Sequence, residues 1–203
     1  MTGPVAGVVL AAGLSRRMGK RNKLVAEIDG KPMVRRVVET ALAAGLDPVV
    51  VVIGHGAADV RAALDGLPVR FAENVRPEAG LSSSLRVGLR AVEGGNPPVA
   101  AAVILLGDMP WVEAGDVRAL VAAFDPASGR EICVPVHEGR RGNPVLWGRR
   151  FIVEITALQG DVGARALLER HEERVRELPV EGVGVLRDVD TSDALAAAVA
   201  SRS

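Results

Sequence analysis

A glycine-rich and strongly cationic loop follows the first apolar run of the sequence. Five of the eight residues between positions 16 and 23 are Lys or Arg, and Gly13 and Gly19 lie before and within this stretch. Glycine lets a backbone curl around an anion and offer its amides as donors, while Arg and Lys neutralise the charge. We therefore predict that residues 10–23 bind a polyphosphate. The alternative interpretation is a solvated basic loop that holds no ligand.

Two well-known phosphate-binding motifs do not fit this loop. A Walker loop has four residues between its glycines and then Lys followed by Ser or Thr. Here five residues separate Gly13 from Gly19, and an arginine follows Lys20. The dinucleotide fingerprint G-x-G-x-x-G is also absent, because leucine and serine follow Gly13. The loop therefore indicates another class of phosphate-binding protein.

Carboxylates follow two later parts of the chain and suggest a divalent cation. Asp108 comes directly after the apolar run at 99–106, and Asp188 and Asp190 follow a further predicted strand. Magnesium binds hard oxygen ligands and commonly takes one or two protein carboxylates together with substrate phosphates and water. We predict Asp108 and Asp190 as Mg²⁺ ligands. The alternative for Asp190 is a helix N-cap.

The first half of the chain alternates between strand-like and helix-like patterns. Short apolar runs at 5–10, 48–53, 68–72 and 99–106 predict strands. Helical spacing predicts helices at 32–44, 57–64, 82–92 and 112–124, with Ser82 as the N-cap of the third. This alternation favours a parallel sheet with helices on both faces.

The second half has a looser pattern. We expect strands at 131–136 and 143–147 joined by a polar hairpin at 138–142, then two helical stretches and a strand ending near Val189. An Ala-rich helix is expected at the end of the chain. The predicted fold class is α/β, a single-domain, Rossmann-like three-layer sandwich over residues 1–203 with a mostly parallel, mixed central sheet.

A ligand site is expected at one edge of this sheet. In open α/β sheets, ligands bind beyond the carboxyl ends of the strands where the strand order reverses. The strands at 5–10 and 99–106 are the natural neighbours at such a point, since the cationic loop follows one and Asp108 follows the other.

Composition narrows the class of ligand and the compartment. Basic and acidic residues balance at 25 each, and this absence of a basic excess argues against nucleic acid as a partner. The single cysteine, Cys133, excludes an internal disulfide, fits a reducing compartment and is expected in the core. The apolar runs are too short for a membrane span, and no basic segment precedes the first one, so we expect a cytoplasmic protein without membrane association.

Several motifs, in order along most of the chain, resemble those of the molybdenum cofactor nucleotidyltransferases, and of their cytidylyltransferase branch in particular. The motifs are L-A-A-G-L-S-R-R-M-G at 10–19, N-K-L at 22–24, G-L-S-S-S-L at 80–85, G-D-M-P at 107–110, R-G-N-P-V-L at 141–146, G-D-V-G-A-R at 160–165 and D-V-D-T at 188–191. The resemblance implies a nucleotide-diphospho-sugar transferase-like fold, with a nucleotide-binding half at about 1–110 and an acceptor-binding half at about 111–203.

The resemblance also implies a role for each matching residue. The nucleotide would be held by Leu10, Ala11, Ala12, Gly13, Arg17, Lys23, Ser82, Ser83 and Asp108, with Arg17 and Lys23 on the triphosphate. Mg²⁺ would be bound by Asp108 and Asp190. The pterin acceptor would contact Gly142, Asn143, Pro144, Asp161 and Arg165. Arg17, Lys23 and Asp108 would carry catalysis, in which a molybdopterin phosphate attacks the α-phosphorus of CTP and pyrophosphate leaves.

The choice of nucleotide follows from Ala12. The guanine branch of this family has glycine at the position of Ala12. The methyl group of alanine would narrow the base pocket, which favours a pyrimidine over a purine, and one methyl group changes such discrimination by about 1–3 kcal/mol. CTP is therefore the expected donor and molybdopterin the expected acceptor, with a molybdenum enzyme as a possible recipient of the product. Two positions depart from the pattern of the family. The family has His at the position of Asn143, and it has D-T-P-E where this chain has D-T-S-D from Asp190.

The alternative functions are a guanylyl- or sugar-phosphate nucleotidyltransferase and a non-catalytic protein that delivers the cofactor.

Overall fold

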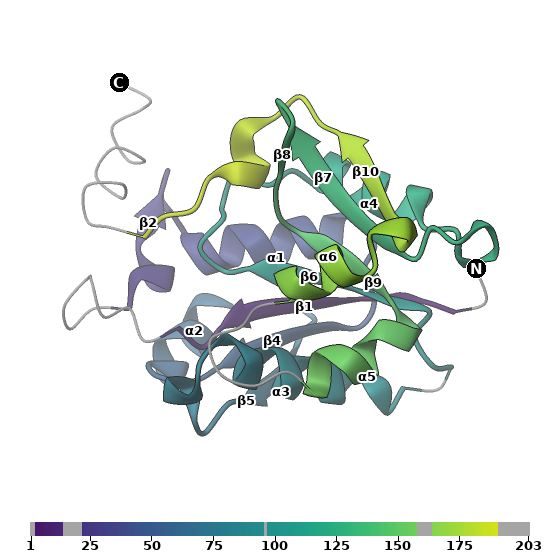
Figure 1. The fold of residues 1–203 in the computed structure, drawn as a ribbon. Coiled ribbons are helices and arrows are strands. Elements are labelled where there is room, and N and C mark those ends of the chain that lie inside the picture. The colour runs from purple at the N-terminus through teal and green to yellow at the C-terminus, as the bar shows by residue number, and fades with distance from the viewer. Residues whose placement is uncertain (1–2, 14–21, 96, 158–163, 191–203) are drawn as a thin grey trace.

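A twisted sheet forms the centre of the computed structural model, which describes residues 3–13, 22–95, 97–157 and 164–190 (Figure 1). Within these residues the sheet has eight strands in the order β10-β7-β9-β6-β1-β4-β5, with β8 paired to β7. The strands are β1 (Val5–Ala11), β4 (Val49–Ile53), β5 (Arg70–Glu73), β6 (Ala101–Leu106), β7 (Ile132–His137), β8 (Arg140–Arg141), β9 (Val145–Gly148) and β10 (Val175–Pro179). A separate hairpin is formed by β2 (Glu27–Ile28) and β3 (Lys31–Pro32).

Most neighbouring strands are parallel. β1 pairs in parallel with β4 and β6, β4 with β5, and β7 with β10. β9 is antiparallel to both of its neighbours, β6 and β7. The predicted α/β fold with a mostly parallel, mixed sheet is therefore confirmed, as is the antiparallel pairing of the two strands expected in the second half.

Helices cover both faces of the sheet (Figure 1). They are α1 (Met33–Ala43), α2 (Ala57–Ala63), α3 (Leu81–Glu93), α4 (Ala114–Ala123), α5 (Arg149–Ala157) and α6 (Arg165–Arg170). Short 3₁₀ helices are η2 (Lys23–Val25), η3 (Pro77–Ala79), η4 (Pro126–Ser128), η5 (Glu172–Arg174) and η6 (Val183–Leu186). None of the described helices is long and apolar enough to cross a membrane.

The alternation of side chains along β1 divides the core into two layers. Val5, Val9 and Ala11 pack with α1, α2 and α4, whereas Ala6, Val8 and Leu10 pack with α3, α5 and α6. Every residue of β1 is buried, because a parallel strand between two helical layers has no solvent-facing side. Cys133 is fully buried, as its apolar surroundings in the sequence predict.

Close packing of α3 against the sheet depends on Gly88. A Cβ atom at this position would lie 2.4 Å from Val8 Cγ1 and 2.7 Å from Val52 Cγ2. The helix therefore approaches β1 and β4 more closely than a residue with a side chain at position 88 would permit. This approach places the N-terminus of α3 near the carboxyl end of β1.

Two local predictions are wrong. Ser82 is not the N-cap of α3, because Gly80 turns the chain there with a φ of 90° and Ser82 is buried within the first turn. The strand expected to end near Val189 is not formed there. The last described strand is β10, which pairs with β7 and ends at Pro179. The chain up to Val189 forms η6 and then extended backbone outside the sheet. The expected C-terminal helix lies outside the described residues.

Candidate functional site

The two strands expected to meet where the strand order reverses, β1 and β6, are neighbours in the sheet. β1 lies between β4 and β6, and Leu10 is in register with Leu106 at the carboxyl ends of the two strands. The N–H of Gly107 donates to the Leu10 carbonyl at 3.0 Å. A Cβ atom on Gly107 would lie 2.9 Å from that same oxygen, so glycine allows the turn carrying Asp108 to close onto β1.

Lys23 projects from the short helix η2 into this junction. Asn22 caps η2, and its Oδ1 accepts a hydrogen bond of 3.1 Å from the Leu24 N–H. Asn22 is buried, and its Nδ2 has no hydrogen-bond partner among the described residues. No role for Asn22 was predicted from the sequence, although this buried donor beside Lys23 is suited to an oxygen of a ligand.

A cluster of one lysine and two carboxylates occupies the junction. Lys23 Nζ lies 2.8 Å from Asp108 Oδ2 and 2.8 Å from Asp190 Oδ1. The side chains of Lys23, Asp108 and Asp190 are 11%, 22% and 48% exposed. Burial by itself lowers the pKa of Lys23, but the charge of Asp108 and hydrogen bonds to both carboxylates outweigh it and raise the pKa. Lys23 is therefore a cation in this arrangement.

A third carboxylate, Asp188, adds negative charge near the cluster. Its pKa is raised by burial and by the neighbouring charges of Asp190 and Asp108. Excess negative charge of this kind favours a bound cation. Among the described residues there is no group of three or more His, Cys, Asp or Glu side chains that could by itself hold a metal ion. Asp108 and Asp190 fit a divalent ion only if further oxygens come from water or phosphate, which is the usual situation for Mg²⁺.

The residues predicted to hold the nucleotide base lie around the end of β1. Ala11 and Ala12 are buried, and Gly13 is exposed. The methyl group of Ala12 packs beside Gly54, where an added Cβ would lie 3.0 Å from Ala12 Cβ. Ser82 is 1% exposed. Arg17 lies outside the described residues.

The hydroxyl of Ser83 stabilises the start of α3. It donates to the Gly80 carbonyl at 2.8 Å and accepts a hydrogen bond of 2.8 Å from Asn74 Nδ2. Asn74 is itself buried, and its second bond, of 3.0 Å, goes to Ser84. Two serines of the motif at 80–85, Ser83 and Ser84, therefore take part in the structure of the helix start next to the end of β1.

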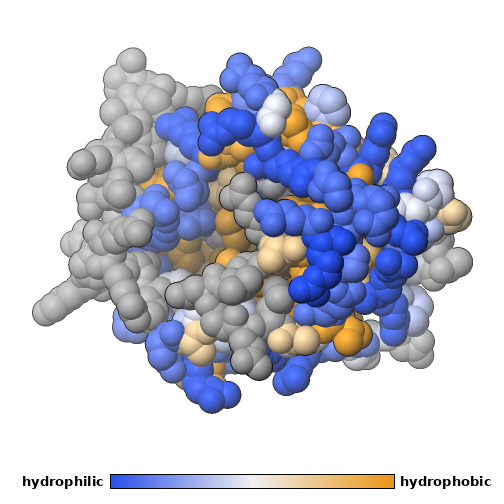
Figure 2. All heavy atoms as spheres, in the orientation of Figure 1, coloured by the Kyte–Doolittle hydropathy of each residue, from blue (hydrophilic) through white to orange (hydrophobic). Residues whose placement is uncertain are grey.

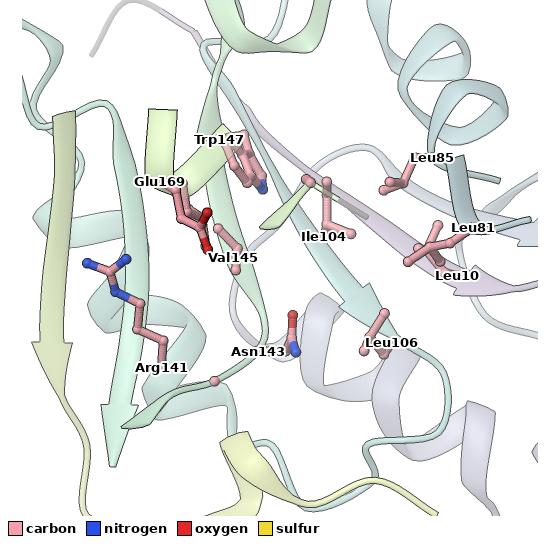
Figure 3. A pocket seen from close by; sticks show the side chains of 13 residues that line it. Leu10, Leu81, Leu85, Ile104, Leu106, Arg141, Asn143, Val145, Trp147 and Glu169 are labelled. Carbon is pink, nitrogen blue, oxygen red and sulfur yellow. The ribbon is translucent and has the colours of Figure 1, made fainter. Parts of the chain in front are cut away.

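A pocket of about 300 Å³ opens on the α3 side of the same junction (Figure 3). Among the coloured residues of Figure 2, hydrophilic side chains predominate on this face, and hydrophobic side chains show between them as small patches. The walls of the pocket are mostly apolar, and leucine side chains lie across it from Arg141 and Glu169. Its lining consists of Leu10, Leu81, Leu85, Ile104, Leu106, Arg141, Gly142, Asn143, Val145, Trp147, Ala164, Leu168 and Glu169.

Two of the residues predicted to contact the acceptor line this pocket. They are Gly142 and Asn143, whereas Pro144 follows a cis peptide bond and is buried. The Asn143 N–H donates to the Val185 carbonyl at 2.8 Å, and the Asn143 side chain lies at the pocket (Figure 3). Asp161 lies outside the described residues. Arg165 begins α6, and its side chain is not described.

Several pocket residues were missed by sequence reasoning. Glu169 on α6 reaches the pocket and has no hydrogen-bond or ion-pair partner among the described residues. Arg141 forms ion pairs with Glu172 and, at 2.6 Å, with Glu177. Arg141 belongs to the R-G-N-P-V-L motif but was given no role there, and no local pattern marks Glu169, because α6 reaches the pocket only through the tertiary fold.

The chain is similar in sequence and in structure to known proteins. Residues 7–175 match the family described as the MobA-like NTP transferase domain. The chain belongs to this family. The crystal structure of Rv0371c from Mycobacterium tuberculosis superimposes with a TM-score of 0.81 at 33% identity, covering 98% of both chains. A complex of the same protein with manganese has a TM-score of 0.77 at 32% identity, covering 98% of this chain and 99% of that one.

Curated relatives share the domain within longer chains. The bifunctional protein GlmU of Sorangium cellulosum is 36% identical over 154 residues, which cover 72% of this chain and 31% of that protein. A probable molybdenum cofactor guanylyltransferase of Natronomonas pharaonis is 36% identical over 130 residues, covering 64% of this chain and 60% of that protein. The chain thus spans about a third of the length of the GlmU relative. Family and fold together confirm the prediction of a nucleotidyltransferase domain.

Proposed function

We propose that the protein transfers the cytidylyl group of CTP to a phosphate of molybdopterin or of its molybdenum-loaded form, with release of pyrophosphate. The observation that carries this proposal is the placement of two features on either side of the end of β1. The cluster of Lys23, Asp108 and Asp190 lies at the turn after β6, and the pocket containing Asn143 lies on the α3 side. A donor nucleotide and an acceptor would meet between them.

The charges of the cluster suit the reacting phosphates. Lys23, together with Arg17 from the loop, would bind the triphosphate and stabilise the negative charge of the departing pyrophosphate. Asp108 and Asp190 would hold Mg²⁺, which supplies charge neutralisation at the α-phosphate when it is bound. The manganese complex of the Rv0371c protein supports a divalent ion in this fold. A phosphate acceptor is already ionised near neutral pH, so no general base is required.

The lining of the pocket supports a ring system as acceptor. A sugar phosphate has several hydroxyl groups, and each loses free energy when it is buried without a hydrogen-bond partner. Most of the pocket lining is apolar, including Leu81, Leu85 and Trp147. The charged side chains of Arg141 and Glu169 lie across the pocket from the leucines, and Asn143 is a further polar residue of the lining (Figure 3). A flat heterocycle with a polar edge fits such a surface better than a sugar does.

CTP is proposed as the donor because of Ala12, and GTP is the main alternative. The guanylyltransferase of Natronomonas pharaonis is the observation that favours GTP. Release of pyrophosphate would be measured with CTP, GTP and UTP, each against molybdopterin and against sugar phosphates, with and without Mg²⁺. We expect the highest kcat/KM with CTP and molybdopterin. Turnover of a sugar phosphate alone would contradict the proposed acceptor.

Asp108→Ala tests the metal assignment in the same assay, and Asp59→Ala on the exposed side of α2 is a matched control. We expect loss of Mg²⁺-dependent turnover for the first variant and wild-type turnover for the second. Wild-type turnover of Asp108→Ala would contradict the assignment. Nucleotide binding without any pyrophosphate release by the wild type would support a non-catalytic delivery protein.

A further inference from the structure

One segment of the chain, residues 182–190, contacts both the turn that carries Asn143 and the turn that carries Asp108. We call this segment the strap. Near its start the Val185 carbonyl accepts the N–H of Asn143 at 2.8 Å, on the acceptor side. Near its end the Val189 N–H donates to the Asp108 carbonyl at 2.9 Å. Its last residue, Asp190, then bonds to Lys23.

The strap is not paired with any strand of the described sheet. It lies outside the sheet, and its side chains rather than a strand ladder must therefore hold it in place. Val189 is one anchor, since it is fully buried in a small cluster with Ile28 and Met33. That cluster is separate from the two main layers of the core.

The second anchor is a stacked pair. The guanidinium carbon of Arg187 lies 3.8 Å from the centre of the Trp111 ring. Trp111 is partly buried and also packs against the cluster around Val189. Trp111 follows the G-D-M-P turn directly, so the ring joins the strap to the turn that carries Asp108. A cation over the face of a tryptophan is the most favourable form of this interaction.

Close backbone contacts at two glycines also hold the strap in place. A Cβ atom on Gly184 would lie 2.1 Å from the Trp111 carbonyl oxygen, and one on Gly142 would lie 2.3 Å from the Val185 carbonyl oxygen. The strap is therefore pressed against both the metal-site turn and the acceptor turn, and glycine is required at each point of contact. Within the described residues, the strap connects the two sides of the site.

We propose that Trp111 and Arg187 are positioning residues that hold the strap, and with it Asp190, beside Lys23 and Asp108. Neither residue lines the pocket, and the pair acts on the site by holding the strap in place. Its effect on metal binding rests on the proposed function, whereas its effect on the strap does not. Arg187 lies between Gly184 and Val189 in the chain, so loss of the stack on Trp111 would loosen the middle of the strap.

Hydrogen–deuterium exchange of the intact protein tests the structural part. We expect the amide of Val189 to exchange faster in Arg187→Ala and in Trp111→Ala than in the wild type. Arg187→Lys and Trp111→Phe keep a cation and a ring face, and they should restore most of the protection. Arg150→Ala is the control, because it removes a similar stack on Phe151, at 4.7 Å, in a separate part of the fold. Unchanged exchange at Val189 in both alanine variants would overturn the proposal.

Titration with Mn²⁺, followed by electron paramagnetic resonance, tests the effect on Asp190. We expect both alanine variants to bind Mn²⁺ about two- to thirty-fold more weakly, the range that corresponds to the loss of one cation–π contact. Trp111→Ala leaves the charge of Arg187 in place, so equal effects of the two variants would support positioning over a direct role of the cation. Faster exchange with wild-type Mn²⁺ affinity would overturn the link to Asp190. A wild type that binds no Mn²⁺ while the exchange results hold would overturn the proposed function and leave the role of the pair intact.

Discussion

Lys23 Nζ and Asp108 Oδ2 lie 2.8 Å apart although the two residues are separated by 85 positions in the chain. The parallel pairing of β1 with β6 brings them together, since one residue follows each strand. The ammonium of Lys23 also reaches Asp190 and so lies between two carboxylates. A divalent cation ligated by both carboxylates would compete with this ammonium, and the nucleotide phosphates would then be its alternative partners.

The substitution Lys23→Ala should therefore have opposite effects on metal binding and on catalysis. Without nucleotide, Mn²⁺ should bind more tightly, because the competing cation is removed from between Asp108 and Asp190. Pyrophosphate release should fall by a factor on the order of 100, since the triphosphate loses a charged partner. Lys31→Ala, which breaks an exposed ion pair with Glu39, is the control. Weaker Mn²⁺ binding by Lys23→Ala would show that the two cations do not compete.

Ala12→Gly should shift the choice of nucleotide toward GTP. Removal of the methyl group opens space next to Gly54, and a methyl group changes discrimination by about 1–3 kcal/mol, or roughly tenfold or more. The measurement is the ratio of kcat/KM for CTP to that for GTP, which does not depend on the fraction of folded enzyme. An unchanged ratio would mean that the buried methyl group does not shape the base pocket.

Asn143→Ala should weaken binding of the acceptor and leave the nucleotide unaffected. The side chain lines the pocket, and loss of one neutral hydrogen bond costs about 0.5–1.5 kcal/mol. The KM for molybdopterin should rise about two- to twelve-fold, with the KM for CTP at the wild-type value. Arg140→Ala on the exposed face of β8 should change neither constant. A selective rise in the KM for CTP would assign the pocket to the donor instead.

Gly88→Ala should lower the free energy of unfolding by about 1–3 kcal/mol, because its Cβ overlaps Val8 and Val52. Urea unfolding monitored by circular dichroism measures this change. Gly115→Ala in α4 is the matched helical control, since a Cβ there meets nothing within 4 Å. It should leave stability unchanged or raise it by up to about 1 kcal/mol. Equal effects of the two substitutions would contradict close contact between α3 and the sheet.

Cys133 should be unreactive toward thiol reagents in the folded protein. Burial is the main cause that raises its pKa, to about 11, so that only about one molecule in a thousand carries a thiolate at pH 8. The thiol should react with a disulfide reagent only after denaturation in guanidinium, and then with a stoichiometry of one. Because the pKa of the folded state is raised, the thiol favours folding below pH 9, and this contribution declines as the pH rises toward 11. Rapid labelling of the native protein would contradict the buried position.

Much of the fold and part of the candidate site could be predicted from the sequence. Continuous apolar runs such as that of β4 occur where a strand is buried on both faces, and helical periodicity marks a helix with one buried face. Both signals are local, so they were accurate to a few residues. The family motifs then associated Lys23 with Asp108, and the order of β1 and β6 in the sheet brings these two residues together. The turn with Asn143, which the motifs predict to contact the acceptor, lines a pocket.

Tertiary structure alone decided what depends on contacts between distant segments. Ser82 has the local pattern of an N-cap, yet Gly80 takes that position because its positive φ lets the chain enter α3 close to the sheet. The strap has the sequence pattern of a strand, but β10 is the strand that pairs with β7 on that side. Val189 packs instead into a separate cluster with Ile28 and Met33. Glu169 and the pair of Trp111 and Arg187 belong to the site only because α6 and the strap fold back onto it. Periodicity describes how one element meets the core, whereas the position of each side chain in a site depends on which elements become neighbours.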